Sequence, residues 1–204
     1  MWDVEIQKIF ELPARFIDVT LQTVEINNIL LKDGVAKDVK SGQVQGVGVR
    51  VLNRTWGFAS TNNIDDFLAI AEKAYRGSKN GREIKFSAGI AVEDKVLVKP
   101  AKDPWEVSFG EKRELLHQAE EELRNYKEVV SSSISYADSK SSILYMNSEG
   151  SEIYAEYPRV AFSTYVFAKK DGKIQGASER LGGVGGLEHL KGYLGAAAEA
   201  ARKA

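Results

Sequence analysis

The spacing of apolar residues changes along the chain from a helical to a strand-like period, and this change predicts the order of elements. Apolar positions in Val4–Leu12 recur at helical spacing up to Pro13, which predicts a short first helix. From Ile17 onward apolar and polar residues alternate, as in a strand with one buried face. Asp33-Gly34 separates two such runs and predicts a hairpin, because both central residues of its turn must accept positive φ.

A second alternating run, Val44–Leu52, carries valines on one face and small or polar residues on the other. We expect its valine face to join the apolar face of the first strand in one core, beneath a helix over Ile64–Tyr75 that ends at Gly77. The residues of this expected core are Ile17, Val19, Leu21, Val47, Val49, Val51, Phe67 and Ala71.

The second half of the chain begins with a helix signal and continues with strands. Ser108 and Glu111 have the spacing of a capping box, which predicts a helix start. Val160–Ala168 is largely apolar on both faces, which favours a central strand covered on both sides. A final helix is expected over Leu187–Ala204. The expected strands are Trp56–Ser60, Val92–Val98, Val129–Tyr136, Ser142–Asn147, Glu152–Glu156, Val160–Ala168 and Lys173–Ser178.

Runs of strands punctuated by a few helices predict an α+β fold with a mainly antiparallel sheet and three to four helices. The blocks Phe16–Leu52 and Val130–Phe167 share an order of strand, turn with glycine, and long apolar strand. This order is compatible with a duplicated hairpin-plus-helix unit. The alternative is that antiparallel meanders resemble one another without duplication.

Composition removes several classes of function. The 204 residues include 28 Lys+Arg and 29 Asp+Glu, a net charge of −1, which argues against binding to nucleic acid or an anionic membrane. The absence of cysteine excludes disulfides, thiolate zinc sites and cysteine nucleophiles. No apolar run is long enough to span a membrane, and the acidic Met1–Glu5 does not resemble a signal peptide, so we expect a cytoplasmic protein.

Catalytic templates do not match, and we predict no catalytic or metal-binding residue in this chain. His117 and His189, its two histidines, have no helical partner at metal-ligand spacing. The glycine cluster Gly182, Gly183, Gly185 and Gly186 lacks the Lys-Ser/Thr pair of a phosphate loop and is predicted to be a flexible hinge or connector. The expected organisation is therefore a domain over 1–181, then a connector and helix over 182–204.

Three stretches resemble the TldD/PmbA family. The first runs from Gly34-Val35-Ala36-Lys37-Asp38 to Gln45–Val51, similar to the family's glycine-containing "qGvGvRv" segment. The second is Trp56–Thr61, similar to "xGFAsT". The third combines Asn147–Gly150 with the long strand from Pro158 and the passage Gly182–Glu188. Their order matches the family from about residue 14 to the end of the chain.

The resemblance implies an intracellular zinc-dependent peptidase of unfolded peptide segments, for which modulator of DNA gyrase is a historical name. In this family a C-terminal half carries H-E-x-x-x-H and the zinc, and that motif is absent from this sequence. The resemblance therefore implies a non-catalytic N-terminal half without a cofactor of its own. Such a half would shape a chamber for extended peptides, which could add to an exposed strand edge, and would take part in a homo- or heterodimer.

Two other hypotheses come from different classes. One is an autonomous module that binds peptides or a partner protein and has no protease role. The other is a DNA-gyrase or DNA-binding regulator, which follows only from the historical family name and which the charge balance opposes.

Overall fold

The computed structural model describes residues 6–87 and 89–204, and its contacts divide the chain into two compact units. Each unit gathers three separate stretches of the sequence. Unit 1 consists of Met1–Val24, Gln43–Leu97 and Ser141–Glu156, and unit 2 of Glu25–Gly42, Val98–Lys140 and Tyr157–Ala204. Residues 182–204 belong to unit 2 together with 157–181, and a domain boundary at residue 181 stays a prediction.

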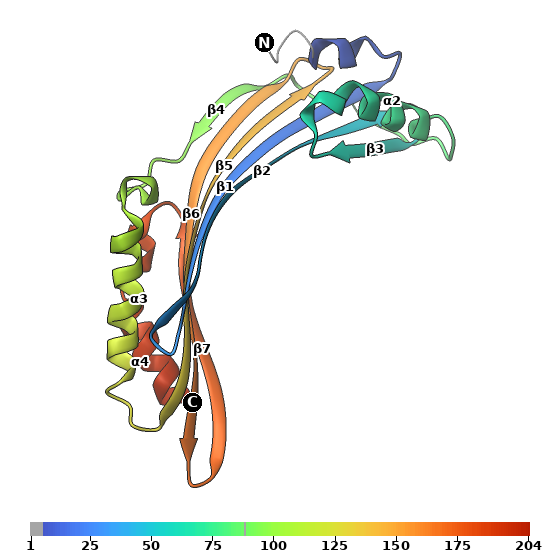
Figure 1. Cartoon of the computed structure of the whole chain (residues 1–204). Helices are drawn as coiled ribbons and strands as arrows, with labels where there is room; N and C mark the ends of the chain where they lie inside the picture. Colours follow the sequence, from blue (N-terminus) through green and yellow to red (C-terminus); the bar gives the residue numbers. More distant parts are fainter. Residues whose placement is uncertain (1–5, 88) are drawn as a thin grey trace. The chain divides into compact units, whose positions relative to one another are not determined.

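The fold is α+β, as predicted, with a mainly antiparallel sheet (Figure 1). The strands are β1 (Phe16–Lys32), β2 (Val35–Leu52), β3 (Trp56–Thr61), β4 (Glu93–Leu97), β5 (Val129–Asn147), β6 (Glu152–Lys170) and β7 (Lys173–Val184). The α-helices are α2 (Phe67–Ser78), α3 (Phe109–Leu123) and α4 (Tyr193–Lys203). The 3₁₀-helices are η1 (Lys8–Glu11), η2 (Ile64–Asp66), η3 (Pro104–Glu106) and η4 (Leu187–Leu190).

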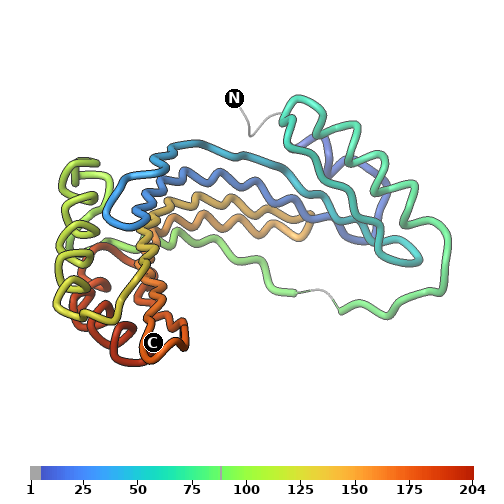
Figure 2. The backbone as a smooth tube through the Cα atoms, turned by 60° about the horizontal axis from the view of Figure 1, so that its bottom comes forward, coloured from blue at the N-terminus to red at the C-terminus, as the bar shows by residue number. Residues whose placement is uncertain are grey.

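Strand order is β3-β2-β1-β5-β6-β4, and β7 also pairs with β6. In unit 1 the segments of β2, β1, β5, β6 and β4 can be followed in this order in Figure 2. The pairs β2–β3 and β6–β7 are antiparallel, whereas β4 runs parallel to β6. The two-residue link Asp33-Gly34 makes β1 and β2 the predicted hairpin, with both residues at positive φ.

One order of elements occurs twice along the chain. A hairpin, a third antiparallel strand and then a helix are formed by β1, β2, β3 and α2, and again by β5, β6, β7 and α4. The blocks compared at the sequence level are thus both long hairpins, which agrees with a duplicated hairpin-plus-helix unit.

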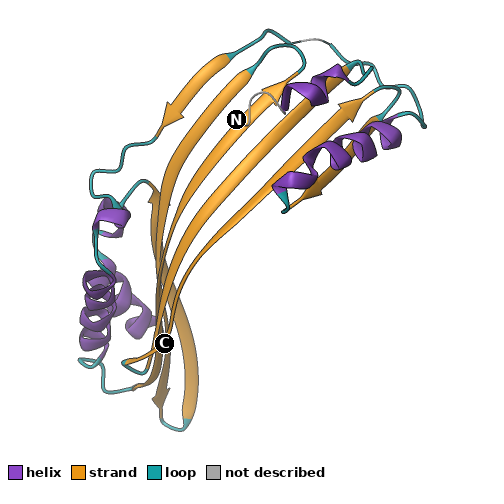
Figure 3. Cartoon of the chain, turned by 45° about the horizontal axis from the view of Figure 1, so that its top comes forward, coloured by secondary structure: helices purple, strands orange, loops and turns teal. Residues whose placement is uncertain are grey.

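The core of unit 1 lies between the sheet and α2, which packs on β3 (Figure 3). The predicted valine face is buried there: Val49 and Val51 are fully inaccessible. Leu21 is partly buried against the same core. The other predicted members, Ile17, Val19, Val47, Phe67 and Ala71, all lie in this core, which confirms the prediction.

The core of unit 2 encloses a buried ion pair. Lys112 on α3 contacts Asp138 on β5, with Nζ 2.6 Å from Oδ2, and both side chains are almost inaccessible. Asp138 also accepts hydrogen bonds from Asn27 Nδ2 at 2.8 Å and the Tyr136 hydroxyl at 2.7 Å. Burial, together with the hydrogen bond and charge of Asp138, raises the pKa of Tyr136 above its usual range. The network ties α3 to β5 and β1 within unit 2.

Three details of the predicted strands were wrong. Val129–Tyr136 and Ser142–Asn147 form one strand, β5, because the polar residues between them are satisfied inside the fold, as Asp138 is. Glu152–Glu156 and Val160–Ala168 likewise form the single strand β6. β6 is not covered on both faces, since Tyr165 and Phe167 are 43% and 40% exposed.

The terminal helices also differ from expectation. Residues 4 and 5 of the predicted Val4–Leu12 helix lie outside the described residues, and the rest includes the 3₁₀-helix η1. The predicted helix over Leu187–Ala204 is broken into η4 and α4 because Gly192 has φ +93°, a left-handed conformation that interrupts a right-handed helix. The capping box is confirmed: Ser108 Oγ accepts from Glu111 N, and Glu111 accepts from Ser108 N.

The close approach of α2 to β3 predicts that Gly57 cannot carry a side chain. A Cβ built there would lie 1.9 Å from the carbonyl oxygen of Ala74 on α2. Gly57→Ala should lower the free energy of unfolding by about 3 kcal/mol, the cost of forcing packed backbones apart, measured by urea denaturation. Gly42→Ala, where a Cβ meets nothing within 4 Å, is the matched control. Equal stability of both variants would contradict the packing described.

The buried ion pair generates a second prediction. Asp138→Ala leaves Lys112 charged in the core without its partner and should cost about 3–5 kcal/mol of unfolding free energy. Urea denaturation measures this loss. Glu121→Ala removes one carboxylate from the exposed side of α3 and should change stability little. A small effect of Asp138→Ala would show that the pair does not hold α3 in place.

Candidate functional site

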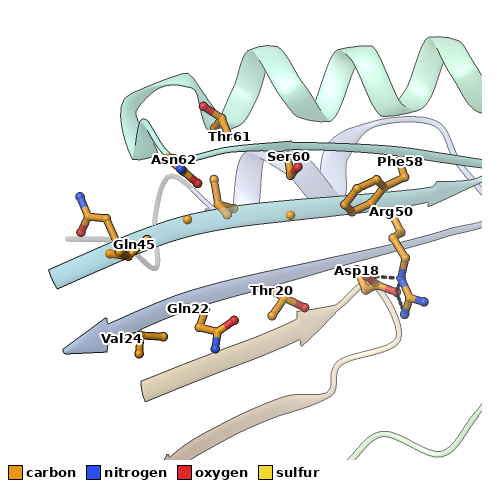
Figure 4. Close-up of a pocket in the computed structure, with 14 residues that line it drawn as sticks. Asp18, Thr20, Gln22, Val24, Gln45, Arg50, Phe58, Ser60, Thr61 and Asn62 are labelled. Atoms are coloured by element: carbon orange, nitrogen blue, oxygen red, sulfur yellow. Dashed lines mark hydrogen bonds and ion pairs between the residues drawn. The ribbon is translucent and has the colours of Figure 1, made fainter. Parts of the chain in front are cut away.

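A trough of about 380 Å³ lies in unit 1 on the sheet face opposite α2 (Figure 4). Its floor is the run from Val44 to Arg50 on β2, and side chains of β1 and β3 flank it. Because side chains alternate across a strand, Val47, Val49 and Val51 point into the core while Gly46, Gly48 and Arg50 face the trough. The flanking residues are Asp18, Thr20, Gln22 and Val24 from β1, and Phe58, Ser60, Thr61 and Asn62 from β3 and its end.

The floor is low because two positions have no side chain. Gly48 pairs with Ser60 across β2 and β3, so two small residues lie side by side. A Cβ at Gly48 would lie 3.4 Å from the Phe58 ring, and one at Gly46 would lie 3.1 Å from the Asn62 side-chain oxygen. The glycines therefore leave backbone accessible between the side chains of the neighbouring strands.

An ion pair closes one end of the trough. Arg50 donates from Nε and Nη2 to the Asp18 carboxylate, and the shortest distance, Nη2 to Oδ2, is 2.7 Å. The Asp18 side chain is 2% exposed and that of Arg50 is 54% exposed. The hydrogen bonds to Asp18 raise the pKa of Arg50, although partial burial acts in the other direction. The pair therefore holds a permanently charged guanidinium at the rim in a fixed orientation.

Aromatic side chains lie next to the guanidinium of this pair. The Arg50 guanidinium carbon lies 5.4 Å from the centre of the Trp56 ring, within the range of a cation–π contact. Trp56 in turn packs edge-on against Phe16 and Phe86, at centroid distances of 5.9 and 5.8 Å. Phe58, 65% exposed, is the cross-strand neighbour of Arg50 on β3. The arrangement can bind a ligand through hydrogen bonds and aromatic contact.

Sequence reasoning did not identify this site. It placed small or polar residues opposite the valines of Val44–Leu52 but assigned no function to that face. The signal that the sequence offered was Asp18, the acidic residue among the polar positions of the alternating run that begins at Ile17. Its pairing with Arg50 depends on which strands become neighbours, and an alternating pattern does not specify that.

The predicted connector glycines belong to unit 2. Gly182 and Gly183 belong to β7, where Gly182 pairs with Ala161. Gly185 has φ +136° and donates from its N–H to the Pro158 carbonyl. A Cβ on Gly186 would lie 2.0 Å from the Lys102 carbonyl oxygen. The structure thus places these glycines at close contacts, and their role as a hinge stays a prediction about motion.

Glu188 links the end of the glycine cluster Gly182–Gly186 to the Ala101–Lys102 segment. Its carboxylate accepts hydrogen bonds from the backbone N–H groups of Ala101, Lys102 and Gly186, at 3.2, 2.9 and 2.8 Å. Desolvation acts to raise the pKa of Glu188, but the hydrogen bonds from backbone N–H groups outweigh it and lower the pKa to about 2. His189 rests against Gly183 and Gly185, and His117 lies on α3.

The Glu188 contacts predict a pH-dependent stability. Because the folded state holds the carboxylate below its ordinary pKa of 4.5, its contribution is complete above about pH 4.5 and is lost as the pH falls toward 2. Glu188→Gln should lower the melting temperature by about 2–4 °C near neutral pH. The difference from wild type should shrink below pH 4.5 in calorimetric scans, whereas Glu121→Gln should show neither effect. A difference that grows on acidification would contradict the assignment.

Metal donors are dispersed in the part of the chain that the structure describes. Across residues 6–87 and 89–204, no group of three or more His, Cys, Asp or Glu side chains lies close enough together to hold a metal ion. In the same residues no helix is both long and apolar enough to cross a membrane.

Family models match two parts of the sequence. The PmbA/TldA metallopeptidase domain 1 matches residues 17–78, and the PmbA/TldA metallopeptidase central domain matches residues 102–204. A metalloprotease of Methanothermobacter thermautotrophicus is 36% identical over 181 residues, which cover 87% of this chain and 39% of that protein. A metalloprotease of Methanocaldococcus jannaschii is 31% identical over 208 residues, which cover 98% of this chain and 46% of that protein.

Solved structures show the same fold at low sequence identity. A Thermotoga maritima protein described as a modulator of a DNA gyrase has a TM-score of 0.79 at 15% identity, covering 99% of this chain and 48% of that one. TldE from Thermococcus kodakarensis has a TM-score of 0.76 at 13% identity, and the match covers 100% of this chain and 47% of TldE. The chain spans less than half the length of these relatives. On the two family matches and the identity to curated metalloproteases, the chain belongs to the PmbA/TldD metallopeptidase family, of which it represents the N-terminal half.

Proposed function

We propose that this chain is the non-catalytic, substrate-handling part of a PmbA/TldD-type metallopeptidase, where it contacts extended peptide segments and helps to shape the chamber that admits them. The observation that carries the proposal is the trough over Gly46 and Gly48, on a sheet face that the helices of unit 1 leave uncovered. Amides and hydroxyls line it, and these groups pair with the N–H and C=O groups of an extended chain.

The zinc that the family implies does not fit the residues described here. A catalytic zinc takes three protein ligands and leaves one position for water, and the described residues contain no such donor group. We therefore assign no catalytic step to this chain and place zinc chemistry, as part of the proposal, in the C-terminal half of the whole protein.

Participation in a dimer is also part of the proposal. Tyr165 and Phe167 stack edge-on at 4.9 Å on the exposed face of β6, and Ile174 on β7 is 61% exposed. Exposed aromatic and apolar side chains of this kind support a contact with another protein chain, which would be a second copy or a family member.

The test uses one preparation of the purified chain and three measurements. A fluorescent, unstructured peptide of Ala, Ser, Thr, Asn and Gln should bind in an anisotropy titration, and an excess of a small folded protein should not compete. Metal analysis should find no stoichiometric zinc, and the peptide should remain intact with or without a chelator.

Two results would contradict the proposal. No peptide binding would remove the substrate-handling role. One zinc per chain together with chelator-sensitive cleavage would show a catalytic site that the described donors do not reveal.

A further inference from the structure

The trough differs from a strand edge because it opens on the face of the sheet. An edge offers unpaired backbone groups, whereas β2 lies between β3 and β1 and is paired with β3 from Val47 to Leu52. Side chains normally keep a second layer about 10 Å away from a sheet. With no side chain at Gly46 and Gly48, and with Ser60 and the edge of the Phe58 ring beside Gly48, a ligand can come closer to the sheet here.

The width and length of the trough match an extended chain. From Val47 to Arg50 the strands β1 and β3 lie on either side of β2, so their backbones are about 9–10 Å apart from the spacing of neighbouring strands. From Val44 to Arg50 the floor is about 20 Å long at roughly 3.3 Å per residue. An extended segment of about six residues would fill it.

The lining is electrically neutral as a whole. Asp18 and Arg50 are the charged residues that line the trough, and they neutralise one another. The other polar lining groups are hydroxyls and amides: Thr20, Gln22, Gln45, Ser60, Thr61 and Asn62. A charged side chain entering this site would lose water without gaining an unpaired opposite charge, which costs binding energy.

Arg50 is the strongest donor in the site. A guanidinium has five N–H donors; its contacts with Asp18 use Nε and Nη2, and the Tyr145 side chain also forms a hydrogen bond with it. Its side chain remains 54% exposed at the end of the floor. Because Asp18 already balances the charge, a neutral acceptor such as a peptide carbonyl suits the remaining donors better than a second carboxylate does.

We propose that the trough seats an uncharged, extended peptide segment face-on above Gly46 and Gly48, with Arg50 donating a hydrogen bond to one of its carbonyl oxygens. This inference rests on the proposed function and adds the location, the orientation relative to the sheet and the charge preference of the bound segment. Arg50 is in this role a binding residue, and Asp18 a positioning residue.

Filling the floor tests the location. Gly48→Val places methyl groups above β2 next to Phe58, at a position that any residue can adopt, and should weaken binding of the Ala/Ser/Thr/Asn/Gln peptide at least tenfold. Gly42→Val adds the same group to the same strand outside the trough and should leave affinity unchanged. Gly48→Ala should give an intermediate loss, and circular-dichroism melting establishes that each variant is folded.

Charge and the Arg50 contact are tested separately. Peptides with one central Glu or one central Lys should each bind at least fivefold more weakly than the neutral peptide. The double variant Asp18→Asn/Arg50→Gln removes the guanidinium without leaving Asp18 charged and unpaired, and should weaken neutral-peptide binding severalfold.

The outcomes separate this inference from the proposed function. If wild type binds the peptide but Gly48→Val binds it equally well, the location is wrong while the substrate-handling role stands. If the charged peptides bind as tightly as the neutral one, or if the Asp18→Asn/Arg50→Gln variant keeps full affinity, the assigned recognition is wrong. If wild type binds no peptide, the proposed function itself fails.

Discussion

The two-residue period of the strands in unit 1 is the constraint on which both its core and its trough depend. The same stretch of β2 that buries Val47, Val49 and Val51 presents Gly46, Gly48 and Arg50 to the opposite face. A one-residue slip would expose the valines and bury the guanidinium, so the hydrophobic effect that holds the core also specifies the face of the trough. The register of β2 therefore determines both which residues stabilise the core and which residues line the trough.

Both units contain a buried aspartate neutralised by a cation that contacts aromatic rings. In unit 1 Asp18 pairs with Arg50, which lies over Trp56. In unit 2 Asp138 pairs with Lys112, whose Nζ lies 5.3–5.7 Å from the centres of the Phe109, Tyr136 and Trp105 rings. A buried carboxylate is tolerated when a partner and hydrogen bonds replace water. The difference lies in exposure, because Lys112 is enclosed while Arg50 reaches the surface and remains available to a ligand.

Local signals in the sequence predicted local structure well. The Asp33-Gly34 turn, the Ser108–Glu111 capping box and the valine face of β2 each depend on residues a few positions apart, and all occur as expected. The strand break predicted within β5 was wrong because polar residues such as Asp138 are satisfied by partners far away in the sequence. The predicted cover over both faces of Val160–Ala168 was wrong because an apolar sequence does not state whether another layer covers a face, and Tyr165 and Phe167 are exposed.

The sequence by itself determined the α+β class, the hairpin of β1 and β2, the start of α3 and, through motif order, the family to which the chain belongs. Periodicity and turn chemistry act over neighbouring residues, so a single sequence contains them. Only the tertiary structure decided that Asp18 meets Arg50, that Gly48 lies beside Ser60, and that Glu188 gathers N–H groups from the Ala101–Lys102 segment. These contacts join residues 12 to 87 positions apart, and the pairing of strands and the closure of loops bring them together.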